Sequence, residues 1–203
     1  MTRKTIYLIR HGQTDFNLQG IVQGSGVNSS LNQTGRNQAN EFYDHYKDVP
    51  FQVVITSDLN RTIETASPFI DLGIPHHTYP EFNEIDWGIL EGEKPSPENR
   101  EDFRNMLTTW SSGDYTTAIE GGENPWQVHE RMKKGIQKLN EVKRNPVLIV
   151  SHGRAMRILL CTMLNKPLSE MDSFPHTNTS LYKLEWDGEK FESILENDLS
   201  HLG

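Results

Sequence analysis

The sequence predicts an α/β protein, a three-layer sandwich with a mostly parallel central sheet flanked by helices and a C-terminal antiparallel hairpin. Short aliphatic runs alternate with stretches of helical periodicity, which is typical of βαβ units with right-handed crossovers. Two of the aliphatic runs, 6–9 and 147–150, each lead within two residues into His-Gly. Near the end, two strand-like runs flank Asp187-Gly188, which is the strongest hairpin signal in the chain.

The first strand is expected over 6–9, because this apolar run leads directly into the polar residues Arg10 and His11. The polar, glycine-containing stretch 13–30 is expected to be a loop that crosses the site. A helix should begin at Asn32 or Thr34. Its apolar residues recur at helical spacing and should face the sheet; they are Ala39, Phe42, Tyr43 and Tyr46.

A second strand is predicted over 51–56, followed by a helix that carries Arg61 in its first turn. The stretch 75–122 is the least regular part of the chain, with a short strand at 77–80 and a helix at 98–110. It has too few apolar residues for a core of its own. We therefore expect a single domain spanning 1–203, in which residues about 76–122 form an insertion that covers the active site.

The last third of the chain continues the alternation of strands and helices. A long helix should begin at Pro125, a residue suited to the first helical position. A strand at 147–151, a helix at 154–164 and the terminal hairpin at 180–195 complete the prediction. The last strand of that hairpin would leave an exposed sheet edge, and pairing of two such edges would form a homodimer. The sequence itself leaves the oligomeric state open.

Composition excludes several classes of function. The net charge is −8 with no dense Lys/Arg cluster, so nucleic acid is not an expected partner. No apolar segment approaches the ~18 residues that span a bilayer, and no signal-peptide pattern follows Met1, so we expect a cytoplasmic protein without a membrane partner. No metal-ligand spacing and no glycine-rich nucleotide loop occurs, so no metal and no cofactor is predicted.

The residues at the predicted strand ends point to phosphoryl transfer. Ligands of open α/β sheets bind beyond the carboxyl ends of the strands, where Arg10, His11, Arg61 and His152 are expected. Two guanidinium groups and two imidazoles can surround a tetrahedral dianion, and the planar arginine fork meets two oxygens at once. A neutral imidazole is a competent nucleophile near pH 7, which makes His11 the expected acceptor of the phosphoryl group.

Four blocks in this order resemble the histidine phosphatase superfamily, and within it the phosphoglycerate mutase-like branch. They are Arg10-His11-Gly12 with Thr14 and Asn17; Ser57-Asp58 with Arg61-Thr62 and Thr65-Ala66; Glu84 ahead of Gly88 and Glu91-Gly92; and Ser151-His152-Gly153. The resemblance extends from about residue 8 to residue 180, which is nearly the whole chain.

The resemblance implies roles for individual residues. His11 would carry the phosphoryl group, while Arg10, Arg61 and His152 would bind it. Spacing alone does not select the proton donor among Glu81, Glu84, Asp86, Glu91 and Glu93. The resemblance implies that it is Glu84. The expected substrate-binding residues are Asn17, Gln23, Gly24, Gly153 and Asn178.

Three functions remain open at this point. The segments 84–92 and 22–31 resemble the phosphatase members, and only Lys94, Arg100 and Arg104 supply cations between residues 84 and 123. A metal-independent phosphatase acting on a small phosphorylated metabolite is therefore expected. A cofactor-dependent phosphoglycerate mutase and a noncatalytic phospholigand-binding module are the alternatives. Specificity should reside in 76–122, where Trp87 and Trp110 are candidates for shaping the pocket and the acidic residues would disfavour polyanionic substrates.

Overall fold

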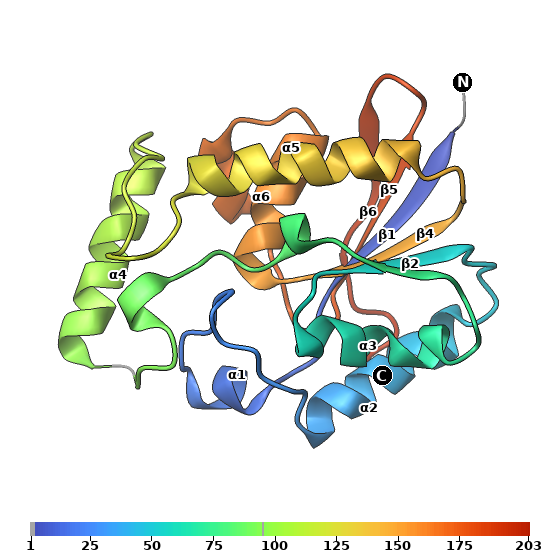
Figure 1. Cartoon of the computed structure of the whole chain (residues 1–203), viewed down its shortest axis with the longest axis horizontal. Coiled ribbons are helices and arrows are strands. Elements are labelled where there is room, and N and C mark those ends of the chain that lie inside the picture. The colour runs from blue at the N-terminus through green and yellow to red at the C-terminus, as the bar shows by residue number, and fades with distance from the viewer. Residues whose placement is uncertain (1–2, 95) are drawn as a thin grey trace.

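The computed structural model describes residues 3–94 and 96–203 and contains one six-stranded sheet (Figure 1). Its strands lie in the order β3-β2-β4-β1-β5-β6. The strands are β1 (Lys4–Arg10), β2 (Val53–Thr56), β3 (His76–Thr78), β4 (Val147–Ser151), β5 (Leu181–Trp186) and β6 (Phe191–Asp198). The first four are parallel to one another, and β5 and β6 are antiparallel. This confirms the mostly parallel sheet with a C-terminal hairpin.

Helices cover both faces of the sheet, as Figure 1 shows for α5 and α6 on one side and α2 and α3 on the other. The helices are α1 (Asp15–Gln19), α2 (Gln33–Tyr46), α3 (Asn60–Ile70), α4 (Pro97–Ser111), α5 (Pro125–Glu141) and α6 (Gly153–Met163). Short 3-10 helices lie at Pro80–Phe82, Gly88–Leu90 and Leu168–Ser173. The three-layer arrangement is therefore confirmed.

The alternation of side chains along the strands explains the three layers. In β1, Ile6 and Leu8 face a core shared with α5 and α6, whereas Tyr7 and Ile9 face a core shared with α2 and α3. Successive side chains of a strand point to opposite faces, so apolar residues at every position require a helix layer on each side. The continuous apolar runs of the sequence are the signature of this arrangement.

The stretch 13–30 is not entirely a loop, contrary to the sequence prediction. Thr14 caps a short helix, α1, and its hydroxyl accepts from the backbone of Asn17 at 3.1 Å. Gly20 ends the helix in the left-handed conformation, with φ 66°. Because α1 buries none of its residues, no apolar periodicity marked it in the sequence.

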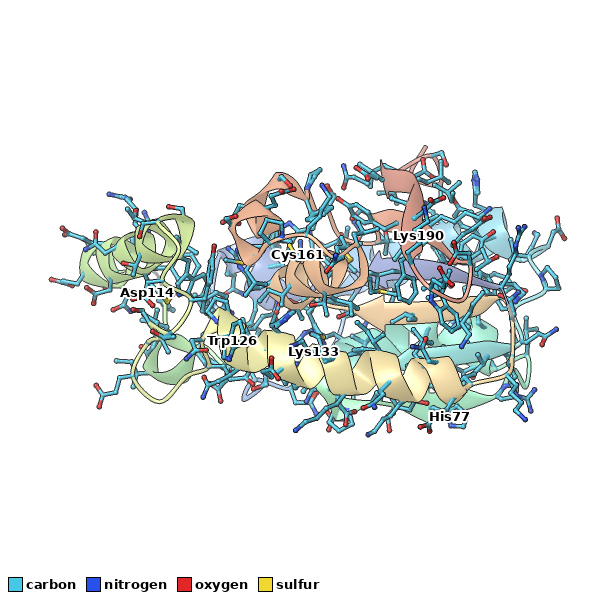
Figure 2. The ribbon with its side chains drawn as sticks, turned by 90° about the horizontal axis from the view of Figure 1, so that it is seen from above. His77, Asp114, Trp126, Lys133, Cys161 and Lys190 are labelled. Atoms are coloured by element: carbon cyan, nitrogen blue, oxygen red, sulfur yellow. The ribbon has the colours of Figure 1, made fainter. Side chains whose placement is uncertain are left out.

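The stretch between β3 and α5 packs onto the same core as the sheet. Trp110 of α4 is fully buried, and its ring stacks on Trp87 with the centroids 5.9 Å apart. In Figure 1 and Figure 2, α4 lies at one end of the molecule, away from the strands. Cys161 is a buried residue of α6, and Lys133 lies on the outer face of α5 (Figure 2). In the described part of the chain, no helix has the length and apolar character needed to cross a membrane.

Candidate active site

The two His-Gly motifs follow neighbouring strands and meet at one edge of the sheet. β1 and β4 pair in parallel, with Arg10 opposite Ser151, so His11 and His152 emerge side by side. Their ring centroids lie 5.3 Å apart, and the two side chains are 2% and 0% exposed. The structure therefore brings together two imidazoles that are separated by some 140 positions in the sequence.

The ring of His11 is oriented by its own backbone neighbour. Its Nδ1 lies 2.7 Å from the carbonyl oxygen of Gly12. A carbonyl can only accept, so Nδ1 carries the proton and Nε2 keeps its lone pair. Burial lowers the pKa of His11 well below its ordinary value, and the nearby charges of Arg61 and Arg10 lower it further. His11 is therefore a neutral imidazole near pH 7, with a nucleophilic nitrogen available.

His152 is held between Arg61 and Ser57. The Nε of Arg61 donates to His152 Nδ1 at 3.1 Å, so the proton of this ring lies on Nε2 and is donated to Ser57 Oγ at 2.8 Å. Burial lowers the pKa of His152 well below its ordinary value, with Arg61 as the next cause. Both ring nitrogens are thus engaged within the protein, and His152 is oriented from two sides.

Arg61 is fully buried at the start of α3 and connects several parts of the site. Besides His152, it donates to the carbonyl oxygens of Val27 at 2.7 Å and Gly24 at 3.0 Å. Burial lowers its pKa to about 10, which leaves it charged near neutrality. A guanidinium has five N–H groups, so the three bonds leave donors that an anion can use.

Arg10 supplies a second cation at the same edge. Its Nη1 donates to the carbonyl of His176 at 3.2 Å, while its Nε is buried and meets no acceptor in the described residues. A buried donor without a partner costs on the order of 1–3 kcal/mol. An anionic oxygen bound in the site would satisfy this donor, which makes Arg10 suited to bind a phosphate.

Glu84 lies in the same cavity wall as His11 and faces the N-terminus of α6. Its Oε1 accepts from the backbone N–H groups of Ile85 at 3.0 Å and Ala155 at 2.8 Å. Its Oε2 accepts from Arg154 N–H at 3.1 Å. Three backbone N–H groups thus fix the carboxyl group of Glu84 at the cavity wall.

The amide side chains predicted as substrate-binding residues surround His11. Asn178 Nδ2 donates to the carbonyl of His11 at 2.9 Å and to Asn17 Oδ1 at 3.3 Å. Asn17 and Gln23 line the cavity, and Gln23 Nε2 also donates to Thr14 Oγ1 at 2.7 Å. Asn178 therefore connects His11 to Asn17 in the cavity wall.

The two predicted glycines are places of close approach. A Cβ at Gly24 would lie 2.0 Å from Glu91 Oε1, and a Cβ at Gly153 would lie 3.0 Å from His176 Nε2. Burial and the charge of Arg10 lower the pKa of His176 to about 3, so its ring is neutral beside the two arginines of the edge. Gly153 thus lets α6 begin directly against the phosphate side of the site.

The cavity in front of these groups has a volume of about 160 Å³. Its wall is formed by Arg10, His11, Asn17, Ile21, Val22, Gln23, Glu84, Trp87 and Phe103. Trp87 lines it as expected, whereas Trp110 is fully buried in the core and does not. Arg61 and His152 do not line this cavity; both are fully buried, with the ring of His152 beside that of His11.

Two residues that contact the site were not predicted from the sequence. Thr65 accepts from the N–H of Gly12 at 2.9 Å, and Arg131 donates to the carbonyl of Glu84 at 3.0 Å. Arg131 is 47 residues away from Glu84 in the chain, on the otherwise regular helix α5. Only its position on the side of α5 that faces the core distinguished it, and that position does not identify a partner.

The chain is similar to several known proteins along nearly its whole length. The family model of the histidine phosphatase superfamily (branch 1) matches residues 6–199. Uncharacterized phosphatase PhoE of Bacillus subtilis (strain 168) is 32% identical over 97% of this chain and 96% of its own. The probable phosphoglycerate mutase GpmB of Erwinia tasmaniensis is 29% identical, over 97% and 94%. The solved structure of Bacillus stearothermophilus YhfR has a TM-score of 0.86 at 29% identity, covering 98% and 100% of the two chains.

Proposed function

Because the chain belongs to the histidine phosphatase superfamily, we propose that it is a metal-independent phosphatase that hydrolyses a small phosphorylated metabolite through a phosphohistidine on His11. The observation that carries the proposal is the state of His11. Its ring is neutral, its Nε2 lone pair is free, and Arg10 and Arg61 lie beside it. A nucleophile flanked by two cations is what attack on a phosphate dianion requires.

In the first step, Arg10 Nε and the remaining N–H groups of Arg61 bind the phosphate oxygens. Nε2 of His11 attacks phosphorus, the P–O ester bond breaks, and its electron pair leaves with the alcohol oxygen. Glu84 gives that oxygen a proton, so the alcohol departs neutral. Donors aimed at the transferring group are each worth on the order of 3 kcal/mol in the transition state.

In the second step, water replaces the alcohol. The Glu84 carboxylate takes a proton from the water, whose oxygen attacks phosphorus while the P–N bond breaks and its electron pair returns to His11 Nε2. Inorganic phosphate leaves, and Glu84 is again protonated for the next turnover. After the two steps the enzyme is restored, because the proton that left with the alcohol has been replaced by one from the water.

The alternative is a phosphoglycerate mutase, which the names of several relatives suggest. A mutase must hold a second acidic group of its substrate, and hence needs cations opposite the phosphate. Lys94, Arg100 and Arg104 are the cations that 84–123 offers in the sequence. Of these, Arg100 lies at a cavity that adjoins the site, with Glu93 in the same wall. This charge balance favours hydrolysis.

The proposal extends to the organisation of the chain. We propose that residues 1–203 act as one domain and that residues about 76–122 form the insertion over the active site. Trp87 and Phe103, both from that stretch, line the catalytic cavity and support this. A cytoplasmic location and a homodimer stay predictions.

The decisive experiment traps the covalent intermediate. The protein is mixed with ³²P-labelled 4-nitrophenyl phosphate, quenched within milliseconds, and analysed for an acid-labile, base-stable label at His11. We expect the label and phosphate release in the presence of EDTA, and loss of both in His11→Ala. The matched control is His77→Asn on the exposed strand β3, which should retain both.

Three results would contradict the proposal. Undiminished turnover in His11→Ala would remove the nucleophile. Phosphate binding without any label would indicate the noncatalytic module. Isomerisation of 3-phosphoglycerate that is greatly stimulated by the bisphosphate would indicate the mutase.

A further inference from the structure

A second cavity of about 330 Å³ adjoins the catalytic cavity. Its wall comes from the end of α1, the segment 88–93 and α4. In Figure 1, α4 lies at the end of the molecule away from the sheet. Its wall is formed by Gln19, Gly20, Val22, Leu90, Glu93, Asn99, Arg100 and Phe103. Val22 and Phe103 line both cavities, so the two adjoin at these side chains.

The side chains shared with the catalytic cavity are apolar. Val22 and Phe103 offer no hydrogen-bond donor or acceptor at the junction, and Leu90 extends the apolar wall further. The ring of Phe103 packs on Trp87 with the centroids 5.0 Å apart, which holds it at the junction. A ligand group that leaves the catalytic cavity therefore meets aliphatic and aromatic surface first.

This surface disfavours two classes of phosphate ester. A sugar phosphate would place hydroxyl groups against Val22, Leu90 and Phe103, and each hydroxyl without a partner loses the hydrogen bonds it makes in water. A bisphosphate would need several cations, whereas this wall offers Arg100 together with the opposite charge of Glu93. The apolar part of the wall therefore disfavours hydroxyl groups, and the presence of Glu93 in the same wall as Arg100 disfavours a second phosphate.

We propose that the second cavity binds the alcohol portion of the substrate, and that the preferred substrate is the monophosphate of an apolar cyclic or aromatic alcohol. The inference rests on the proposed function for the place of the phosphate, beside His11 and Arg10. Burial of the apolar group against Val22, Leu90 and Phe103 supplies the binding energy. A hydroxyl group placed against these three side chains finds no side-chain hydrogen-bond partner on them, and this supplies the selectivity. Phe103 is the specificity-determining residue, since it lines both parts of the site.

A substrate series tests the inference through kcat/KM. Ethyl phosphate, glycerol 3-phosphate and 2-(1-naphthyl)ethyl phosphate are all esters of primary alcohols, so differences in leaving-group chemistry are small. We expect the naphthyl ester to exceed ethyl phosphate by at least about tenfold, in line with the value of apolar groups in a matching pocket. A preference for glycerol 3-phosphate, or equal values for all three esters, would overturn the inference.

Variants of α4 connect this preference to the cavity. Phe103→Ala should lower kcat/KM for the naphthyl ester by about tenfold more than it lowers kcat/KM for ethyl phosphate. Glu101→Ala is the matched control, because Glu101 is exposed on the same helix and lines neither cavity. If Phe103→Ala fails to fold, Phe103→Leu should show the same selective loss with a smaller amplitude. An equal loss for both esters in the folded variant would refute the role of Phe103.

A binding measurement separates this inference from the proposed function. Calorimetry with 2-(1-naphthyl)ethylphosphonate and methylphosphonate requires no turnover. A dissociation constant that is lower by at least about tenfold for the naphthyl compound would support the cavity inference, whether or not any ester releases phosphate. A failure of every ester to release phosphate would overturn only the proposed function. Equal constants would overturn the cavity inference, even in a protein that hydrolyses ethyl phosphate.

Discussion

Arg131 and Glu123 form a side-on ion pair in which two hydrogen bonds join guanidinium and carboxylate, Nε to Oε1 at 2.9 Å and Nη2 to Oε2 at 2.8 Å. The other donors of Arg131 bind the backbone carbonyls of Glu81, Asn83 and Glu84 at 2.8–3.0 Å. Glu123 Oε2 also accepts from the N–H of Asp86 at 3.1 Å. The pair therefore fixes the path of the chain on both sides of Glu84.

Replacing Arg131 should impair catalysis through the position of Glu84. Arg131→Lys keeps the charge but loses the planar fork, and we expect kcat to fall by about 10- to 100-fold with KM nearly unchanged. The loss of kcat should be larger for an alkyl phosphate than for 4-nitrophenyl phosphate. The departing alkoxide must receive a proton from Glu84, whereas 4-nitrophenolate can leave without one. Lys133→Ala on the outer face of α5 is the control and should behave as wild type. An equal loss with both substrates would indicate a merely structural role.

Glu84 itself should show the same dependence on the leaving group more strongly. In Glu84→Gln, the amide has no acidic proton to give the departing oxygen, so kcat for ethyl phosphate should fall by about 10²- to 10⁴-fold. The formation of the phosphohistidine from 4-nitrophenyl phosphate should be much less affected, since that phenolate leaves without protonation. Rapid-quench measurement of the label with each ester distinguishes the two cases. Equal rates of labelling in Glu84→Gln and wild type with ethyl phosphate would exclude Glu84 as the acid.

The buried histidines predict how stability depends on pH. Burial lowers the pKa of His11 and of His152 well below the ordinary value, so the unfolded chain binds protons near and below pH 6.5 that the folded protein does not. The free energy of unfolding should therefore fall as the pH drops below about 6.5, by about 1.4 kcal/mol per pH unit for each of the two groups.

Urea unfolding between pH 4.5 and 7.5 measures this slope. In His152→Asn, the slope below pH 6 should decrease by about 1.4 kcal/mol per pH unit relative to wild type. His11→Asn should give a decrease of similar size. A slope that stays the same in both variants would show that the two rings titrate alike in the folded and unfolded states.

Gly12 should tolerate no side chain. A Cβ there would lie 2.5 Å from the backbone oxygen of Gly35, and neither backbone can yield without moving the turn after β1. We expect Gly12→Ala to lower the free energy of unfolding by about 1–3 kcal/mol and to reduce kcat by displacing His11. Gly203→Ala is the control, because a Cβ at Gly203 has nothing within 4 Å. Wild-type stability and activity in Gly12→Ala would contradict the close approach.

Much of the fold was predictable because its strands and helices correspond to local patterns of apolar residues in the sequence. The apolar runs of β1 and β4 and the helical spacing of α2 and α5 were confirmed, since burial on both faces of a parallel sheet demands those residues wherever the strands lie. The short helix α1 was missed because it buries no residue and thus leaves no periodic signal. Its start could be inferred only from the hydrogen bonds of Thr14.

The sequence by itself determined that two strands lead into His-Gly and that arginines lie near strand ends. It could do so because the end of a strand is marked locally, where an apolar run gives way to polar residues and glycine. Only the tertiary structure decided that β1 lies beside β4, which brings the rings of His11 and His152 to 5.3 Å. It also decided the protonated nitrogen of each ring and the contact of Arg131 with the chain at Glu84. These features depend on the pairing of groups far apart in the chain, and no periodicity of either partner alone records such a pairing.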